Sequence, residues 1–448
     1  MDGSGYKGME DERGLWVEGW SNRSYWLDGL TPPEIPGGDL PREVDVVIVG
    51  SGYTGLNAAI ETARGGRSTL VLDAEVPGWG CSSRNGGQIS TSIKPSLAKL
   101  AARHGRDRAE AIRAEGRAAL DWIGERIEAE GIDCDFRRSG RFHAAHTPAA
   151  YEELARDADI LRRTEGIEVE MIPRAEQRRE LGSDAYHGAA LFPRHGSLHP
   201  ARYVHGLIRT ALDAGARIMG ETPVTGITSG PTGHEVQTPR GTVRARDVIV
   251  ATNGYTTGVT PWQQRRVIPI GSYIIATEPL DGGVMDRLFP TDRIASDTCK
   301  VVYYYRPSPD RTRILFGGRV SAGETDTSIS GPRLHHDMCR IFPELRQTRI
   351  SHSWMGTVAY TFDELAHCGT HDGVHYAMGY CGSGVSMASY LGMRMGQKVL
   401  GLKEGQTAFD DLPFPTRPFY TGRPWFLPAA VAWYRWNDAR QRDRAMAG

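Results

Sequence analysis

The chain has 448 residues, of which 40% are hydrophobic and 24% charged, and its formal net charge is −1. This length predicts two domains rather than one simple core, and the composition is that of a globular protein. The near-neutral charge argues against a nucleic-acid partner, and the lack of any run of about 18 apolar residues argues against a membrane span.

The six cysteines are scattered, with neither a C-x-x-C pair nor the spacing of a metal site. We therefore expect reduced thiols and a cytoplasmic protein. The N-terminal sequence is polar and partly acidic. It lacks the basic segment and apolar stretch of a signal peptide, so none is expected.

Residues 1–43 form an arm rich in glycine, proline and charge, interrupted by Trp16, Trp20, Tyr25 and Trp26. Aromatic residues at this density favour an arm that docks on the body of the protein over a free tail.

A β-turn-α-β unit follows the arm. Residues 44–50 are a short β-branched run typical of a buried parallel strand. Helical periodicity then runs from Tyr53 to about Arg64, where two glycines end it. Residues 68–74 predict the second strand.

Helical spacing of apolar residues predicts one or two helices over 95–130 and further helices over 147–165 and 200–215. Residues 246–251 predict a strand. Segments 266–278 and 300–320 alternate as antiparallel strands do. Residues 375–400 predict a strand, a glycine turn and a long helix.

The turn after the first strand, Gly50-Ser51-Gly52-Tyr53-Thr54-Gly55, has the spacing G-x-G-x-x-G. After a strand and before a helix, this pattern is a dinucleotide-binding fingerprint: Gly50 allows the turn, Gly52 admits the pyrophosphate, and Gly55 lets helix and strand pack closely. Asp73, at the end of the second strand, is placed to accept hydrogen bonds from ribose hydroxyls and would repel a 2′-phosphate.

The fingerprint leaves NAD and FAD both open. Two features favour FAD. The strand–helix–strand pattern of a nicotinamide domain does not continue, and glycine-rich pieces recur far apart, at 86–87, 317–318 and 379–384. A large flavin held between distant segments fits that arrangement.

The stretch from Gly78 to Gln88, GWGCSSRNGGQ, resembles the signature loop of the D-amino-acid-oxidase-like FAD superfamily. Within it, the chain is most similar to the γ-glutamylputrescine oxidase group, from about Trp16 to residue 435. Four pieces carry the resemblance: the fingerprint, the Ser83–Gln88 loop, the pair Tyr304–Arg306 with Phe316–Gly318, and the glycine turn Gly379–Val385.

The resemblance implies a glutathione-reductase-like, discontinuous FAD-binding Rossmann domain (44–95, 195–258 and 365–405) with an inserted mixed β-sheet substrate domain (96–194 and 259–364), and a C-terminal tail, 406–448. Together with the fingerprint, it implies a set of cofactor-binding residues: Gly50, Gly52, Tyr53, Thr54, Gly55, Asp73, Ser83, Arg84, Asn85, Gly86, Gly87, Gln88, Val224, Thr252, Asn253, Gly379, Gly382, Ser383, Gly384 and Val385.

Several positions depart from the pattern of the related sarcosine oxidases. Val358 stands where those relatives attach FAD to a cysteine, which implies non-covalent FAD here. Leu315 stands where they place a lysine that promotes reaction with oxygen, and Ser386 where a lysine helps bind the substrate carboxylate. Ser383 replaces the histidine of the common G-x-x-G-H-G pattern.

Oxidation of an amine depends more on how the carbon beside the nitrogen is oriented towards the flavin than on an acid–base pair of side chains. Tyr304 and Arg306 are candidates to orient the substrate, with Arg306 pairing a carboxylate; the alternative for Arg306 is a structural ion pair. Trp354 is a candidate wall of the pocket or a core residue. Cys381 is interpreted as a packing residue, although a helix N-terminus lowers thiol pKa values.

We expect an FAD-dependent oxidoreductase that oxidises a C–N bond of an amine or N-substituted amino acid to an imine, with O2 or another electron acceptor. The alternatives are a 2-hydroxy acid or polyol dehydrogenase and a flavoprotein with structural FAD. The aromatic, basic C-terminal stretch is interpreted as a last helix packed on the body, with a membrane-surface segment as the alternative.

Overall fold

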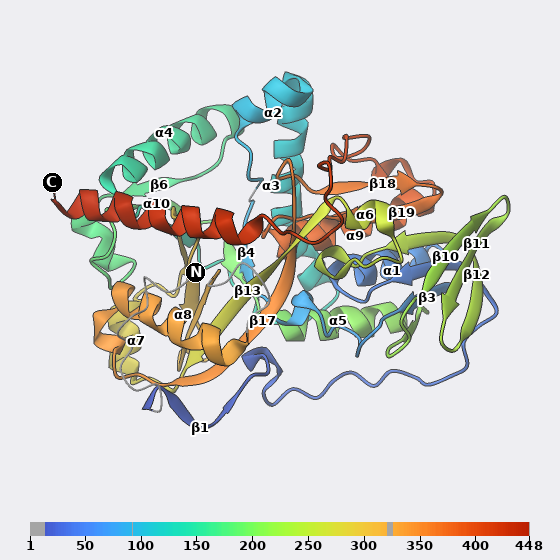
Figure 1. Cartoon of the computed structure of the whole chain (residues 1–448), viewed down its shortest axis with the longest axis horizontal. Helices are drawn as coiled ribbons and strands as arrows, with labels where there is room; N and C mark the ends of the chain where they lie inside the picture. The colour runs from blue at the N-terminus through green and yellow to red at the C-terminus, as the bar shows by residue number, and fades with distance from the viewer. Residues whose placement is uncertain (1–13, 92, 320–325, 448) are drawn as a thin grey trace.

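The computed structural model describes residues 14–91, 93–319 and 326–447. The chain is built around two β-sheets, one of eight strands and one of nine (Figure 1). The first 13 residues of the expected arm lie outside the described residues.

The eight-stranded sheet has the order β10-β11-β12-β2-β3-β9, with β19 beside β12 and β18 beside β19. β9, β3, β2, β12 and β19 run parallel, as in a Rossmann sheet. Its strands are β2 (Glu43–Val49), β3 (Thr69–Leu72), β9 (Arg217–Met219), β10 (Gly226–Gly230), β11 (Gly233–Thr238), β12 (Gly241–Val250), β18 (His367–His371) and β19 (Val374–Met378).

Helices α1 (Tyr53–Arg64), α5 (Pro200–Asp213) and α9 (Gly384–Val399) share a buried core with one face of this sheet. α1 and α9 pack against each other. The fingerprint glycines let α1 lie close to β2 and the turn that follows it. Gly50 has φ +104°, and a Cβ on Gly55 would lie 1.9 Å from the carbonyl oxygen of Gly50. The expected β-turn-α-β unit is confirmed.

The nine-stranded sheet is mixed, as expected, with the order β1-β17-β13-β16-β15-β14-β5-β7-β6. The β1–β17 and β14–β5 pairs are parallel, and the others are antiparallel. Its strands are β1 (Trp16–Ser21), β5 (Arg141–Ala144), β6 (Glu170–Ile172), β7 (Ala189–Phe192), β13 (Val267–Thr277), β14 (Ile294–Asp297), β15 (Tyr304–Pro307), β16 (Ile314–Gly318) and β17 (Ile350–Thr361).

One face of the nine-stranded sheet is covered by α7 (Gly282–Leu288) and α8 (Thr327–Ile341), whose apolar residues pack in one core with the residues of that face. The remaining helices are α2 (Leu97–His104), α3 (Arg106–Ala129), α4 (Pro148–Glu165), α6 (Pro261–Gln264) and α10 (Leu427–Ala447). β4 (Gln88–Ile89) and β8 (Gly196–Ser197) form a two-stranded antiparallel sheet. The 3₁₀ turns are η2 (Tyr25–Leu27), η3 (Cys81–Ser83), η4 (Arg174–Arg179), η5 (Asn253–Tyr255), η6 (Pro343–Leu345) and η7 (Lys403–Gly405).

The segment 96–194 contributes to both halves of the molecule. Its strands β5, β6 and β7 belong to the nine-stranded sheet, whereas α3 packs on α9 and its apolar residues belong to the core of the Rossmann sheet. The reason is the spacing of Ile112, Ala119, Ile123 and Ile127, which puts one apolar stripe of α3 against that core.

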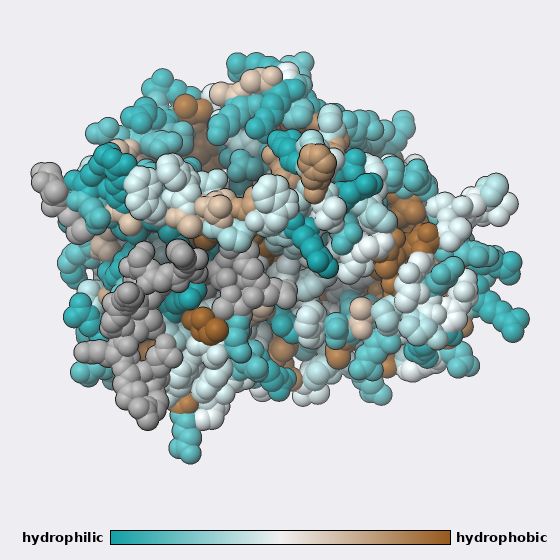
Figure 2. All heavy atoms as spheres, in the orientation of Figure 1, coloured by the Kyte–Doolittle hydropathy of each residue, from teal (hydrophilic) through white to brown (hydrophobic). Residues whose placement is uncertain are grey.

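The described parts of both terminal segments contact the body. β1 pairs with β17, and Trp26 is fully buried, with its indole N–H donating to the carbonyl oxygen of Asn85 at 2.8 Å. α10 is held by Asp438, which is buried and accepts the main-chain N–H groups of Lys300 and Val301. On the face shown in Figure 2, hydrophobic residues form only small separate areas. Within the described ranges, no helix has the length and apolar character needed to cross a membrane.

Candidate active site

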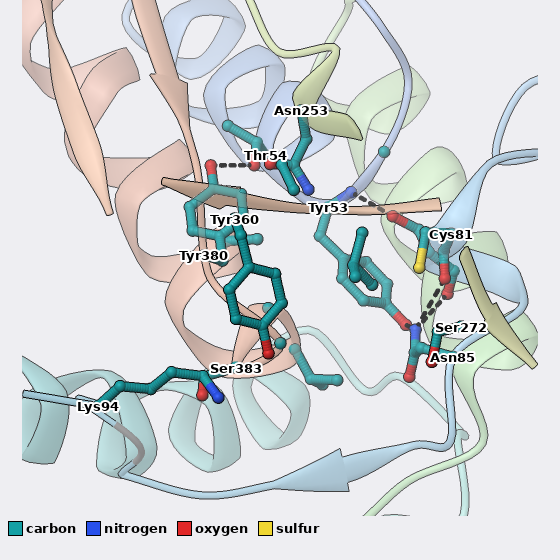
Figure 3. Close-up of a pocket in the computed structure, with 18 of the residues that line it drawn as sticks. Tyr53, Thr54, Cys81, Asn85, Lys94, Asn253, Ser272, Tyr360, Tyr380 and Ser383 are labelled. Carbon is teal, nitrogen blue, oxygen red and sulfur yellow. Dashed lines mark hydrogen bonds between the residues drawn. The ribbon is translucent and has the colours of Figure 1, made fainter. Parts of the chain in front are cut away.

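A cavity of about 1220 Å³ lies between the two sheets and takes lining residues from both. Single-ligand pockets commonly measure about 300–1,000 Å³. The cavity therefore has room for a large cofactor and a second molecule. Figure 3 shows Tyr53 and Asn85 on one side of it and Lys94 and Tyr360 on the other.

The fingerprint forms one end of this cavity. Gly50, Gly52 and Thr54 line it, and α1 begins there at Tyr53, with Gly52 as an N-cap residue that has no side chain to cap it. The main-chain N–H of Tyr53 donates to the Oγ of Ser82 at 3.0 Å. A helix N-terminus with free N–H groups is a site for phosphate. A Cβ on Gly52 would lie 3.0 Å from the Oγ of Ser82, so a side chain there would crowd the space that a pyrophosphate needs.

Asp73 also lines this end. Its Oδ2 accepts both the main-chain N–H of Ser51 at 2.8 Å and the Ser51 hydroxyl at 2.5 Å, and its Oδ1 accepts the main-chain N–H of Glu75 at 3.0 Å. A carboxylate offers about four acceptor positions, so one position remains for a ribose hydroxyl. The uncapped helix, the glycines and this carboxylate together fit the dinucleotide half of FAD.

The other expected cofactor residues divide into two groups. Those that line the cavity are Tyr53, Arg84, Asn85, Gly86, Gln88, Val224, Thr252, Asn253, Gly382, Ser383, Gly384 and Val385. Gly384 starts α9, whose N-terminus has no side-chain cap. This gives the cavity a second helix N-terminus, far in sequence from the first.

Four expected cofactor residues lie behind the cavity wall: Gly55, Ser83, Gly87 and Gly379. Ser83 donates to the main chain of its own loop, and Gly379 donates its N–H to Asn253 at 2.9 Å. Their place in the structure is therefore to shape the loops that carry the lining residues. Arg84 does line the cavity, with its guanidinium 4.1 Å from the Trp79 ring centroid.

The nine-stranded sheet presents one face to the cavity. Because side chains alternate along a strand, Tyr304 points to this face while Tyr303 and Tyr305 point to the core on the other side. The Tyr304 hydroxyl lies 2.8 Å from the Oγ of Ser272, and both residues line the cavity. Burial raises the pKa of Tyr304, so its hydroxyl stays protonated.

Two expected substrate residues do not reach the cavity, which corrects the earlier expectation. Arg306 is buried, and its guanidinium donates to the carbonyl oxygens of Leu198 at 2.9 Å and Gly87 at 3.4 Å. Trp354 is buried and donates to the carbonyl oxygen of Arg84 at 2.8 Å. Both side chains lie on the cavity face of the nine-stranded sheet. Trp26 of the N-terminal arm packs over this part of the face and keeps them out of the cavity.

Several residues that line the cavity were not predicted from the sequence. Tyr360 lies between two cations, with Lys94 Nζ 5.0 Å and Arg319 Cζ 4.4 Å from its ring centroid. At the opposite edge of the sheet, Arg141 and His143 line the cavity. The period-2 pattern could have put Tyr360 on this face, but no local signal marks Lys94 or Arg141.

Two thiols, Cys81 and Cys381, lie near the cavity and next to the α9 N-terminus, respectively. Burial raises the pKa of Cys81 and of Cys381 to about 11 in each case, so both are neutral thiols near pH 7. His352 pairs with Asp28 at 2.8 Å, and His367 with Asp363 at 3.0 Å, outside the cavity lining. Among the residues that the structure describes, no group of His, Cys, Asp and Glu is arranged to hold a metal ion.

Comparison with known proteins shows a family and several relatives. The family model described as "FAD dependent oxidoreductase" matches residues 45–398. A probable oxidoreductase OrdL of Haemophilus influenzae is 29% identical over 408 residues, which are 90% of this chain and 93% of that protein. The γ-glutamylputrescine oxidoreductase of Escherichia coli K12 is 31% identical over 399 residues, 88% of this chain and 92% of that protein.

Solved structures share the fold. Glycine oxidase from Geobacillus kaustophilus matches with a TM-score of 0.70 and 22% identity, over 84% of this chain and 99% of that one. L-proline dehydrogenase from P. horikoshii matches with a TM-score of 0.69 and 18% identity, over 87% and 99%.

Proposed function

Because this chain belongs to the family of FAD-dependent oxidoreductases, whose model matches residues 45–398, we propose that it oxidises the C–N bond of an amine or N-substituted amino acid. The carbon loses a hydride and the nitrogen a proton, which gives an imine. Hydrolysis of the imine gives an aldehyde or keto acid and an amine. The electrons pass finally to O2, which is reduced to H2O2.

The names of the relatives support this reaction class. One curated relative is a γ-glutamylputrescine oxidoreductase, and the solved structures that share the fold include a glycine oxidase and an L-amino acid deaminase. Each name contains a compound with a nitrogen-bearing carbon.

The observation that carries the proposal is the continuity of the cavity. The same space is lined by the fingerprint and by the sheet face that bears Tyr304 and Ser272. When bound, FAD supplies the hydride acceptor. The fingerprint and Asp73 hold the dinucleotide, and the uncapped N-terminus of α9 favours negative charge at its end of the cavity.

The chain's own residues would then orient the substrate and keep its nitrogen neutral. Tyr304 and Ser272 offer a pair of hydroxyls on the sheet face. Lys94 and Arg319, beside Tyr360, place positive charge at the cavity, and like charge disfavours an ammonium ion. A neutral amine is the form that can lose a hydride.

FAD is proposed to be non-covalent. Val358 lines the cavity at the position where sarcosine oxidases carry the flavin-linked cysteine. The cysteine that does line it, Cys81, is a neutral thiol because burial raises its pKa to about 11. Formation of a thioether needs the thiolate as nucleophile.

The test is an anaerobic titration of the FAD-loaded protein with amines, N-alkyl amino acids and 2-hydroxy acids. We expect amines to bleach the oxidised-flavin absorbance and hydroxy acids to leave it unchanged. Re-admission of air should restore the band and release one equivalent of H2O2. Bleaching by hydroxy acids alone would instead identify a hydroxy acid dehydrogenase, and a flavin that no compound reduces would indicate a structural role.

A further inference from the structure

The cavity has a second polar end, away from the arm, at strands β14 and β5. The register pairs Ser296 of β14 with Tyr304 on one side and with His143 of β5 on the other. Paired residues share a face, and Arg141 shares the face of His143 because it stands two residues before it. Arg141, His143 and Ser296 therefore belong to the same cavity face as Tyr304, and all of them line the cavity.

Arg141 is a cation without an acidic partner. Its Nε and Nη2 donate to the Oγ of Ser296 at 2.9 and 2.6 Å, and Nη2 lies 3.3 Å from Nδ1 of His143. Among the described residues, no carboxylate oxygen lies within 4 Å of its guanidinium. Burial lowers the pKa of Arg141 to about 10, which leaves it charged at neutral pH.

Two other arginines of the cavity have acidic partners. Arg113 pairs with Glu165 at 2.9 Å, and Arg106 pairs with Glu110 at 2.7 Å. A guanidinium offers five N–H donors in a planar fork that matches a carboxylate, and a charge removed from water without a counter-ion is costly. Among the described residues, the fork of Arg141 meets only the Oγ of Ser296 and Nδ1 of His143, which leaves N–H donors for a ligand.

Arg141 is surrounded by two neutral histidines and by one carboxylate, that of Asp297, whose pKa burial raises to about 7. Burial and the charge of Arg141 lower the pKa of His195 to about 3, and burial, Arg141 and other cations including Lys94 hold that of His143 well below its usual range. His195 is 4% exposed, and its Nδ1 has no hydrogen-bond partner. The nearby carboxylate of Asp297 is engaged by the N–H groups of Cys299 and Tyr303.

We propose that Arg141 anchors an anion-binding subsite that takes the carboxylate of an elongated amine substrate, at the end remote from the oxidised C–N bond. The proposal rests on the function proposed above, which puts the reacting end near Tyr304. One strand, β14, lies between β15 and β5. At a spacing of about 4.8 Å between neighbouring strands, β5 is about 10 Å from β15. A short α-amino acid cannot span this distance with its own carboxylate.

The experiment compares ω-aminocarboxylates, from glycine to 8-aminooctanoate, with n-alkylamines of equal length. Anaerobic flavin reduction gives the rate, and calorimetry with heptanoate and with heptylamine gives binding without reaction. The variants are Arg141→Met, Arg141→Lys and the control Arg287→Met, whose arginine lies outside the cavity lining, is exposed and is paired with Glu344. Bound FAD and the visible spectrum report that each variant is folded.

In the parent protein, we expect long ω-aminocarboxylates to reduce the flavin faster than glycine and faster than the matched alkylamines. Arg141→Met should lower their kcat/KM by about 100-fold, the size expected for the loss of a buried charge partner. It should leave the alkylamines unchanged. Arg141→Lys should recover part of the loss, and Arg287→Met should behave as the parent.

Equal kcat/KM of parent and Arg141→Met for long ω-aminocarboxylates would overturn the subsite while leaving the oxidase function intact. If no amine reduces the flavin, the proposed function fails, and calorimetry then decides the subsite separately. Heptanoate binding that Arg141→Met abolishes supports it. Heptanoate binding that is absent or unaffected by the substitution overturns it.

Discussion

The hydroxyl of Tyr304 lies 2.8 Å from the Oγ of Ser272, although β16 lies between their strands β15 and β13. Gly317 of β16 makes this contact possible. A Cβ on Gly317 would lie 2.2 Å from the Tyr304 ring, so the ring crosses the strand where a side chain is missing. The glycine thus positions a hydroxyl pair on the cavity face.

Substitution of Gly317 by alanine should displace the Tyr304 ring and break its contact with Ser272. We expect the rate of flavin reduction by the best amine to fall by at least about tenfold, because misplacement of an orienting group by about 1 Å has effects of this size or larger. FAD content should remain unchanged. Stopped-flow absorbance of the FAD-loaded protein measures the rate, and Tyr304→Phe should show a smaller loss in the same direction.

The control for this prediction is Tyr305→Phe. Tyr305 is the next residue of the same strand, but it faces the core on the other side of the sheet, where its hydroxyl lies 3.0 Å from that of Tyr186. An effect of Tyr305→Phe as large as that of Gly317→Ala would mean that strand stability, not orientation, sets the rate.

Asp73→Ala should weaken FAD binding. The substitution removes the proposed acceptor for the ribose hydroxyls and the acceptor of the Ser51 N–H. Loss of hydrogen bonds to a charged group is worth about 1.5–3 kcal/mol, so the Kd for FAD should rise about tenfold or more. Fluorescence titration of the apoprotein with FAD measures it.

Asp45→Ala is the matched control for Asp73→Ala. Asp45 lies on the same sheet and also accepts a main-chain N–H and a hydroxyl, both from Ser68, but it does not line the cavity. We expect the parent Kd for FAD in this variant. A Kd for Asp73→Ala that equals the parent value would show that the carboxylate does not contact the cofactor.

Arg306→Met should separate structural from substrate-binding arginines. Its guanidinium joins the carbonyl oxygens of Gly87 and Leu198, so its loss leaves buried acceptors unpaired, at a cost of about 1–3 kcal/mol. We expect a lower unfolding temperature and weaker FAD retention, with KM for carboxylate-bearing amines unchanged. A selective rise of that KM would restore the original carboxylate-pairing role.

The Rossmann half of the site was predictable because its signal is local. Strand, glycine turn, helix and Asp73 occur within about 30 residues, and the helix begins at Tyr53, as the pattern predicted. Side chains alternate along the strand at 304–307, so Tyr304 and Arg306 lie on one face of the sheet.

Alternation alone could not say what covers each end of that face. Trp26 comes from an arm about 280 residues earlier in the chain, yet it covers Arg306 and excludes it from the cavity. The Arg141 site is likewise non-local, because it requires strands β5 and β14 to pair across 155 residues. Single-sequence patterns do not encode such pairings.

Non-covalent FAD makes a simple prediction. Precipitation of the holoprotein with trichloroacetic acid should leave all of the flavin in the supernatant, since neutral Cys81 and the side chain of Val358 offer no nucleophile. Mass spectrometry of the washed pellet should give the mass of the unmodified chain. A yellow pellet with an added flavin mass would contradict this prediction.

Asp297 should make stability depend on pH. It is 2% exposed, and burial raises its pKa to about 7, against the lowering effect of hydrogen bonds from Tyr303 and Cys299. In the unfolded chain its pKa is about 3.9. Between these two values the folded state holds a proton that the unfolded state has lost, so this group's contribution to stability falls as the pH rises towards 7.

Asp297→Asn removes this titration and keeps an oxygen that can accept both main-chain N–H groups. We expect the free energy of unfolding of Asp297→Asn, relative to the parent, to increase by about 2–3 kcal/mol between pH 5 and pH 8. Urea denaturation at fixed excess FAD measures it at both pH values. Asp133→Asn, a change at an 89% exposed side chain, should show the same difference from the parent at both pH values.

A difference for Asp297→Asn that stays constant with pH would mean that Asp297 is ionised in the folded protein throughout this range. The cavity would then hold a permanent negative charge close to Arg141, and the elongated carboxylate substrate would have to compete with it.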